Sequence, residues 1–102
     1  MPQLGRLHTA RRDDSCLFHL SGEFDLSNAW KVQDALFDSI RYERRDIVVD
    51  LTEVQFMDAQ LVRTLARARS AARRRDLGFL VVPPSEPSVG RVAELVNFDL
   101  AA

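Results

Sequence analysis

One junction in the sequence gathers the groups that a binding site at a helix start needs. Residues 46–58 begin with a short apolar run, become polar, and end at Asp58, where a helical pattern begins. The first turn of a helix has backbone N–H groups without partners and the positive end of the helix dipole. Such a point suits an anion, a phosphorylated side chain or a partner protein.

Arginine supplies almost all of the positive charge. The chain has thirteen Arg and one Lys (Lys31), and its formal net charge is −1. The helix after Asp58 carries a basic group made of Arg63, Arg67, Arg69 and 73–75. Such a group is more often a solvated helix face than a nucleic-acid site, since no aromatic residues interleave it and the net charge is balanced. Beside Asp58, it would favour an acidic partner protein.

Other reactive side chains do not form a catalytic or metal-binding pattern. Cys16 is the single cysteine and lies in an apolar run, so a buried, inert thiol is expected. His8 and His19 lie in strand segments without a Cys or carboxylate at ligand spacing. With no Ser/His/Asp grouping and no Gly-rich phosphate loop, we expect neither an enzyme nor a bound cofactor or metal.

Length and composition indicate one small soluble domain spanning residues 1–102. Hydrophobic residues make up 46% of the 102 residues and charged residues 28%, which is ordinary for a globular protein. No apolar run approaches the ~20 residues of a membrane span, and no N-terminal apolar targeting segment is present. A cytoplasmic location without membrane insertion is the expectation.

The first half of the chain predicts a hairpin and a helix. Residues 4–10 alternate weakly like an edge strand, 11–14 form a charged turn, and 16–20 form a second strand that 21–25 break. Ser27 is predicted as a helix N-cap, with Leu26 packing on the first turn. The buried stripe of this helix is Ala29, Val32, Leu36 and Ile40.

The second half predicts two more strand–helix units. The apolar residues 47–49 form a central strand, and Asp58 caps a helix that buries Leu61, Leu65, Ala68 and Ala72. Gly78 opens the strand 79–82, which Pro83 and Pro84 end. A last helix from Ser85 or Ser88 turns Val89, Val92, Ala93 and Val96 inward. The fold class is α/β, a mixed sheet of about four to five strands with helices mainly on one face.

Three segments together resemble the STAS domain, the family of anti-sigma factor antagonists. Residues 20–26 (LSGEFDL) resemble its GELD signature, and residues 46–58 resemble its central strand and the loop after it. Residues 91–98 resemble its C-terminal helix and final turn. Because the match runs nearly end to end with sensible spacing, the sequence is identified as a member of this family.

The resemblance implies a regulatory binding module without catalysis. In bacterial partner switching, the unphosphorylated domain binds a serine-kinase anti-sigma factor and frees the sigma factor. The kinase then phosphorylates a hydroxyl at the head of the second helix, which breaks the complex. The phosphoryl group acts by adding roughly −1.5 to −2 charges to a tight interface.

The sequence departs from the family at the phosphorylation loop. With Asp58 on the family Asp, Ala59 and Gln60 occupy the two hydroxyl positions and Leu61 the Gly position. A one-residue gap could move Leu61 onto the family Leu, and it would still leave Ala59 and Gln60 in place. An amide cannot accept a phosphoryl group, so Gln60 predicts that the usual serine switch is absent. A neutral Gln resembles the unphosphorylated, binding-competent form.

The predicted partner-binding residues surround this loop. They are Asp25, Thr52, Asp58, Ala59, Gln60, Leu61, Arg63 and Thr64. Asp58 and Asp25 can each be structural only, as a helix cap and a turn residue, and Gln60 can be an ordinary surface residue. Thr64 is placed on the exposed side one turn deeper, and its interior helix position makes it a poor displaced phosphosite.

Two kinds of partner fit the resemblance. An anti-sigma factor of the serine-kinase type is the first. The alternative is a STAS accessory subunit, bound to the transport ATPase of a lipid-transport ABC complex or placed in another signalling assembly. A missing acceptor fits either role, no nucleic acid is expected, and homodimer formation stays open.

Overall fold

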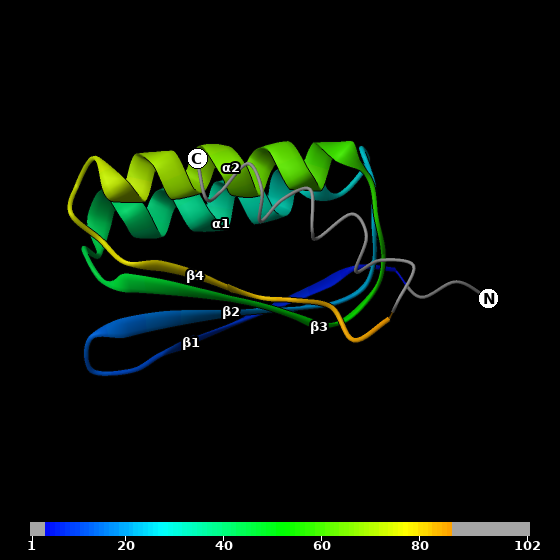
Figure 1. The fold of residues 1–102 in the computed structure, drawn as a ribbon, viewed down its shortest axis with the longest axis horizontal. Helices are drawn as coiled ribbons and strands as arrows, with labels where there is room; N and C mark the ends of the chain where they lie inside the picture. Colours follow the sequence, from blue (N-terminus) through cyan, green and yellow to red (C-terminus); the bar gives the residue numbers. More distant parts are fainter. Residues whose placement is uncertain (1–3, 87–102) are drawn as a thin grey trace.

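The computed structural model describes residues 4–86, in which two helices cover one face of a four-stranded sheet (Figure 1). The elements are β1 (Arg6–Arg11), β2 (Ser15–Phe24), α1 (Ala29–Tyr42), β3 (Asp46–Met57), α2 (Ala59–Arg73) and β4 (Phe79–Val82). The strand order is β1-β2-β3-β4, with β1 antiparallel to β2 and the other neighbours parallel. The predicted mixed α/β sheet is therefore confirmed.

Connectivity explains why both helices lie on the same face. Each helix joins two adjacent parallel strands, and such crossovers are almost always right-handed, so two consecutive crossovers in one direction share a face. Both helices consequently start at the same end of the sheet (Figure 1). The predicted last helix, with its inward residues 89–96, and the family-like segment 91–98 lie outside the described residues.

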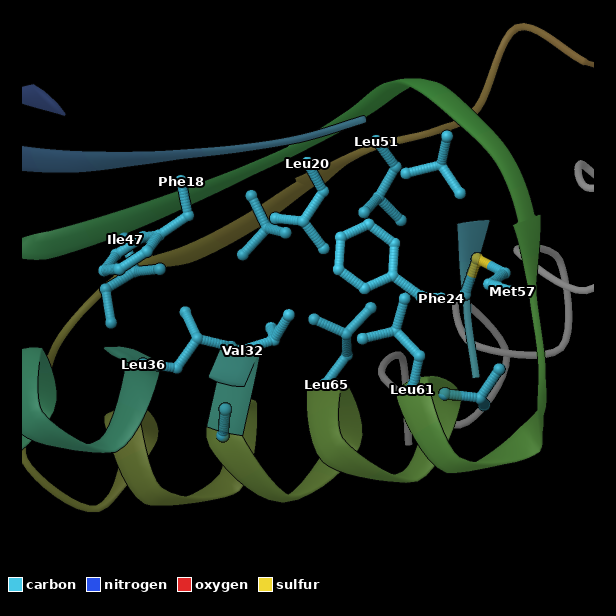
Figure 2. Close-up of a cluster of buried hydrophobic side chains, with 14 of the residues drawn as sticks. Phe18, Leu20, Phe24, Val32, Leu36, Ile47, Leu51, Met57, Leu61 and Leu65 are labelled. Carbon is cyan, nitrogen blue, oxygen red and sulfur yellow. The ribbon is translucent and has the colours of Figure 1, made fainter. Parts of the chain in front are cut away.

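The core fills the layer between the sheet and the helices (Figure 2). The largest fully buried side chains are Phe18, Leu20, Phe24, Ile47, Val49, Leu51 and Val54 on the sheet, and Val32, Leu36, Leu61 and Leu65 on the helices. The predicted stripes of both helices are confirmed, because Ala29, Ile40, Ala68 and Ala72 are buried as well. Close packing of these side chains holds both helices on the sheet.

The single cysteine belongs to this core. Cys16 is fully buried, and its Sγ donates to Glu43 Oε2 at 3.2 Å. Burial raises the pKa of the Cys16 thiol, and the nearby Glu43 carboxylate adds to this increase. A buried thiol that resists ionisation is a poor nucleophile, as the sequence predicted.

Both central strands are longer than predicted. β2 continues through residues 21–24, where a break was predicted, and β3 continues to Met57, where a polar loop was predicted. Both predictions are wrong because the strands stay paired by shifting register. His19 is opposite Asp50, while Ser21 is opposite Glu53, so β3 has one extra residue there. Such β-bulges bend a strand and increase its twist.

Asp50 stabilises the first of these bulges with its carboxylate. Oδ1 accepts from the Thr52 N–H at 2.9 Å and from the Thr52 hydroxyl at 2.7 Å. Oδ2 lies 3.1 Å from Nδ1 of His19 on the neighbouring strand. Burial by itself would raise the pKa of Asp50, but these hydrogen bonds and the charge of His19 hold that pKa below its ordinary value.

The first helix starts later than predicted. α1 begins at Ala29 with Asn28 at the N-cap position, so the prediction that Ser27 is the cap is wrong. Ser27 instead donates its N–H and its hydroxyl to Asp25, which forms a turn before the helix. Leu26 is 71% exposed and does not pack on the first turn as predicted.

The bulge gives a stability prediction. Replacing Asp50 by Ala leaves the half-buried Thr52 donors without their acceptor and should lower the free energy of unfolding at pH 7 by about 1–3 kcal/mol. Asp50→Asn keeps an acceptor oxygen and should lower the free energy of unfolding by less than Asp50→Ala does. Because the Asp50 pKa is lowered, this stabilisation is fully present above the ordinary Asp pKa and is lost as pH falls through the lowered value. Urea unfolding at pH 7 and in acid measures both effects, and equal losses for Asn and Ala at pH 7 would contradict this account.

Candidate functional site

The ends of β2 and β3 bring the two helix starts together at one end of the molecule. Phe24 and Met57, the last residues of the two strands, are opposite each other in register. The Asp58 N–H donates to the Phe24 carbonyl at 3.2 Å. The segments 25–28 and 58–60, which we call the tip, follow directly after these strands. Asp25 and Asp58, predicted to share a surface, are therefore neighbours.

Asp58 caps α2 as predicted. Its Oδ1 accepts from the Gln60 N–H at 2.9 Å, and its backbone carbonyl accepts from the Val62 N–H at 3.4 Å. Such a cap stabilises a helix by ~1 kcal/mol. The structure shows no hydrogen bond to Asp58 Oδ2 from within residues 4–86, so this half-buried carboxylate keeps an acceptor for another group.

Asp25 organises the turn that leads into α1. Its Oδ1 accepts from the Ser27 hydroxyl and from the Ser27 N–H at 2.8 Å, and these two bonds lower the pKa of Asp25. Asn28 fastens the turn to β2, since its Nδ2 donates to the Glu23 carbonyl at 3.0 Å and its Oδ1 accepts from the Asp25 N–H at 2.9 Å. Ser27 and Asn28 were not among the predicted site residues.

The residues at the family's hydroxyl positions form the start of α2. Ala59 is exposed and Gln60 is half-buried on the first turn. Neither side chain carries a hydroxyl, and within the described residues the side-chain amide of Gln60 has no hydrogen-bond partner. The first turn of α2 is therefore a neutral surface beside the Asp58 carboxylate.

Three predicted site residues lie elsewhere. Leu61 is fully buried and Thr64 is 2% exposed, so the prediction that they lie on the surface is wrong. Leu61 is part of the buried stripe of α2, and Thr64 follows it by one turn near the same side. Thr52 lies in β3 with its hydroxyl bound to Asp50, six residues before Asp58. Arg63 is exposed, as expected.

Exposed apolar side chains cluster around the tip, and sequence reasoning missed them. Leu4 is 84% exposed, Leu26 71%, Trp30 56% and Phe56 47%. Leu4 and Phe56 are both paired with Glu23, the residue before the end of β2. Trp30 lies next to the tip, because its Nε1–H donates to the Ser27 carbonyl at 3.1 Å. The available signal was Trp30, which falls outside the core stripe of its helix. Exposed apolar surface of this kind is available for contact with another molecule.

The described residues offer little else for chemistry. Within residues 4–86, no group of three His, Cys, Asp or Glu side chains could hold a metal ion. A cavity of about 810 Å³ is lined by residues such as Ser21, Thr52 and Gln55, and Asp58 and Gln60 are not part of it. No helix in this part of the chain is long and apolar enough to cross a membrane.

Comparison with known proteins gives one family and several similar folds. The family model of the STAS domain matches residues 6–100. No curated protein matches the chain. An anti-sigma factor antagonist from Mycobacterium paratuberculosis is similar with a TM-score of 0.82 and 21% identity, covering 96% of this chain and 82% of its own.

Two further solved structures have the same fold. The anti-sigma factor antagonist SpoIIAA in its unphosphorylated form has a TM-score of 0.74 and 15% identity, with 88% of this chain and 83% of its own covered. The STAS domain of an anti-sigma factor antagonist from Rhodobacter sphaeroides has a TM-score of 0.65 and 17% identity, with 78% and 86% covered.

The turn at Asp25 gives a prediction about pH. Because hydrogen bonds from Ser27 lower its pKa, Asp25 should remain ionised to lower pH than an ordinary Asp, whose pKa is about 3.9. Ser27→Ala removes the hydroxyl bond and should raise the Asp25 pKa towards that value. Carboxyl ¹³C NMR titration measures the midpoint in both proteins. An identical midpoint in both would show that the hydroxyl does not stabilise the carboxylate.

Proposed function

Because the chain belongs to the STAS domain family, we propose that it is a non-catalytic, protein-binding regulator of the anti-sigma factor antagonist type. The tip and the exposed apolar residues around it are the proposed contact surface. The partner is an anti-sigma factor of the serine-kinase type, bound in the cytoplasm of a bacterium. The likeness in fold to three anti-sigma factor antagonists supports this proposal.

The observation that carries the proposal is the composition of the tip. Leu26 and Trp30 expose more than half of their surface beside two carboxylates, Asp25 and Asp58. Interfaces between proteins combine buried aromatic and apolar anchors with a polar rim. A catalytic site would instead lie in a cleft. Asp25 and Ser27 are exposed, and Asp58 does not line the cavity of about 810 Å³.

We also propose that serine phosphorylation does not switch this regulator. Gln60 stands at the acceptor position, and an amide cannot take up a phosphoryl group. Nearby hydroxyls support this view. In sequence, Thr64 is buried and Thr52 is bound to Asp50, and at the tip the Ser27 hydroxyl is bound to Asp25. Without the extra negative charge, the interface keeps its binding-competent form.

The missing acceptor also supports a second candidate. A STAS domain that serves as an accessory subunit, bound to the ATPase of a lipid-transport ABC complex or built into another signalling assembly, needs no switch. The same tip would then contact a transport ATPase. A gene neighbourhood with an anti-sigma kinase favours the first candidate, and one with permease and ATPase genes favours the second.

Charge reversal at the tip tests the proposed surface. Asp58→Arg should weaken binding to the anti-sigma kinase of the same organism by at least about tenfold, because it places a bulky cation in the contact and removes the cap. Asp13→Arg makes the same change of charge in the exposed β1–β2 turn, at the opposite end of the sheet, and should leave affinity unchanged. Calorimetric titration measures both. An equal effect of the two variants would reject the tip as the contact surface, and binding of a transport ATPase alone would reject the antagonist proposal.

Incubation with that kinase and ATP tests the absence of a switch. Mass spectrometry should find residues 59–64 unmodified, and the complex should survive. Gln60→Ser restores a hydroxyl at the acceptor position and serves as the comparison. Phosphate on wild-type Thr64 or on a nearby Ser, together with loss of binding, would overturn the proposal.

A further inference from the structure

Helix α2 and the two residues after it concentrate positive charge without any acidic residue. Residues 59–75 contain six Arg and no Asp or Glu, in a chain whose net charge is −1. Within the described residues, none of these arginines forms an ion pair. Partial desolvation, and then the positive charge of Arg73, lower the pKa of Arg69. Unpaired charge of one sign attracts a partner of the opposite sign.

Three of these arginines form a stripe on the outer side of α2. Arg63, Arg67 and Arg74 are spaced as i, i+4 and i+11, which places them on one helix face, and all three are exposed. Gln60 precedes Arg63 by about one turn, so the stripe starts at the tip. The basic surface is therefore continuous with the proposed contact surface.

The neighbouring edge of α1 supplies apolar surface. Trp30, Gln33 and Phe37 follow one another at helical spacing, and Trp30 is 56% exposed while Phe37 is half-buried. The Arg67 Nη2–H donates to Gln33 Oε1 at 3.0 Å, which shows that the two edges face each other. Between them is a shallow groove of about 540 Å³, lined by Phe37, Ala66, Arg67, Ser70 and Arg74.

We propose that this groove binds an acidic amphipathic helix of the partner protein. Its apolar side chains would pack on Phe37 and Trp30, and its carboxylates would pair with Arg63, Arg67 and Arg74. Arg suits this role because its planar guanidinium binds carboxylates through two parallel hydrogen bonds. An amphipathic helix laid in an apolar groove is a common mode of recognition. The inference rests on the proposed function as a protein-binding module.

The distribution of charge favours an acidic helix over a polyanion. Asp34 and Asp38 are exposed on α1, next to the edge formed by Gln33 and Phe37. A nucleic acid or an anionic membrane would bring negative charge against both carboxylates as well as against the arginines. An amphipathic helix can place carboxylates on the α2 side alone. The half-buried Phe37 that lines the groove offers a polyanion no charge to pair with.

Selection from a peptide library tests the proposal. Helix-forming peptides of ~15 residues would be selected for binding to the full chain, because they span about 22 Å, the length of α2. We expect the selected peptides to have an apolar i, i+3, i+4, i+7 stripe that is flanked on one side by Glu or Asp. Amide shifts in ¹⁵N NMR should change at Trp30, Phe37 and 63–74. Enrichment of neutral or basic peptides, or shifts elsewhere, would overturn the proposal.

Two charge-reversed proteins provide the matched comparison. Arg63→Glu with Arg74→Glu should weaken binding of the selected peptide by at least about tenfold, since both side chains are exposed and have no partner within residues 4–86. The control protein carries Arg6→Glu in β1 and Arg12→Glu just after β1, which is the same change of charge. Its affinity for the peptide should fall by less than about a third of the factor seen for the groove variant. Thermal melting checks that each variant is folded. Equal weakening in the two proteins contradicts a specific groove.

The same proteins separate this inference from the proposed function. Tighter binding of a duplex oligonucleotide or of phosphatidylglycerol vesicles than of the best peptide would reject the acidic helix. If Asp58→Arg abolishes binding of the anti-sigma kinase and the groove variant does not, the groove inference fails and the proposed function stands. If the groove binds acidic peptides while the unaltered chain does not bind the anti-sigma kinase, the groove inference stands and the proposed function fails.

Discussion

The parallel pairing of β2 with β3 is the constraint on which the rest of the structure depends. Because the two strands run in the same direction, both finish at the same end of the sheet, and the chain segments that follow them meet there. The hydrogen bond from the Asp58 N–H to the Phe24 carbonyl is the direct result. Without this pairing, Asp25 and Asp58 would be unrelated turn and cap residues. With it, they border one surface from which both helices begin (Figure 1).

The elements themselves were predictable because their signals are local. Apolar residues at helical spacing identified both buried stripes, Asp58 was recognisable as a cap, and Pro83 ended β4 as expected. The strand lengths were not predictable, since the bulges shift the alternation of buried and exposed residues. Leu51, Val54 and Met57 are buried three residues apart in β3, a spacing that is typical of neither a regular strand nor a polar loop.

The candidate site was only partly predictable, for a related reason. The family pattern pointed to Asp25, Asp58 and Gln60, and these residues do lie at one end of the molecule. It also pointed to Leu61, although the apolar stripe of the helix already placed that residue inward. Thr64 was predicted on the exposed side, and both residues are buried. The exposed Trp30 could have been recognised, because it falls outside the core stripe of α1. The exposed Leu26 could not be distinguished from a core residue before the start of α1 was known.

The amide of Gln60 has a consequence for how such a regulator would be controlled. A surface that a kinase can modify and a phosphatase can restore responds within the lifetime of the protein. A surface without that hydroxyl has one state, so its influence follows the number of molecules in the cell relative to their target. Control then passes to synthesis, dilution by growth and proteolysis. In the proposed regulator, the side chain at position 60 would thereby replace a reversible signal with control through the number of molecules.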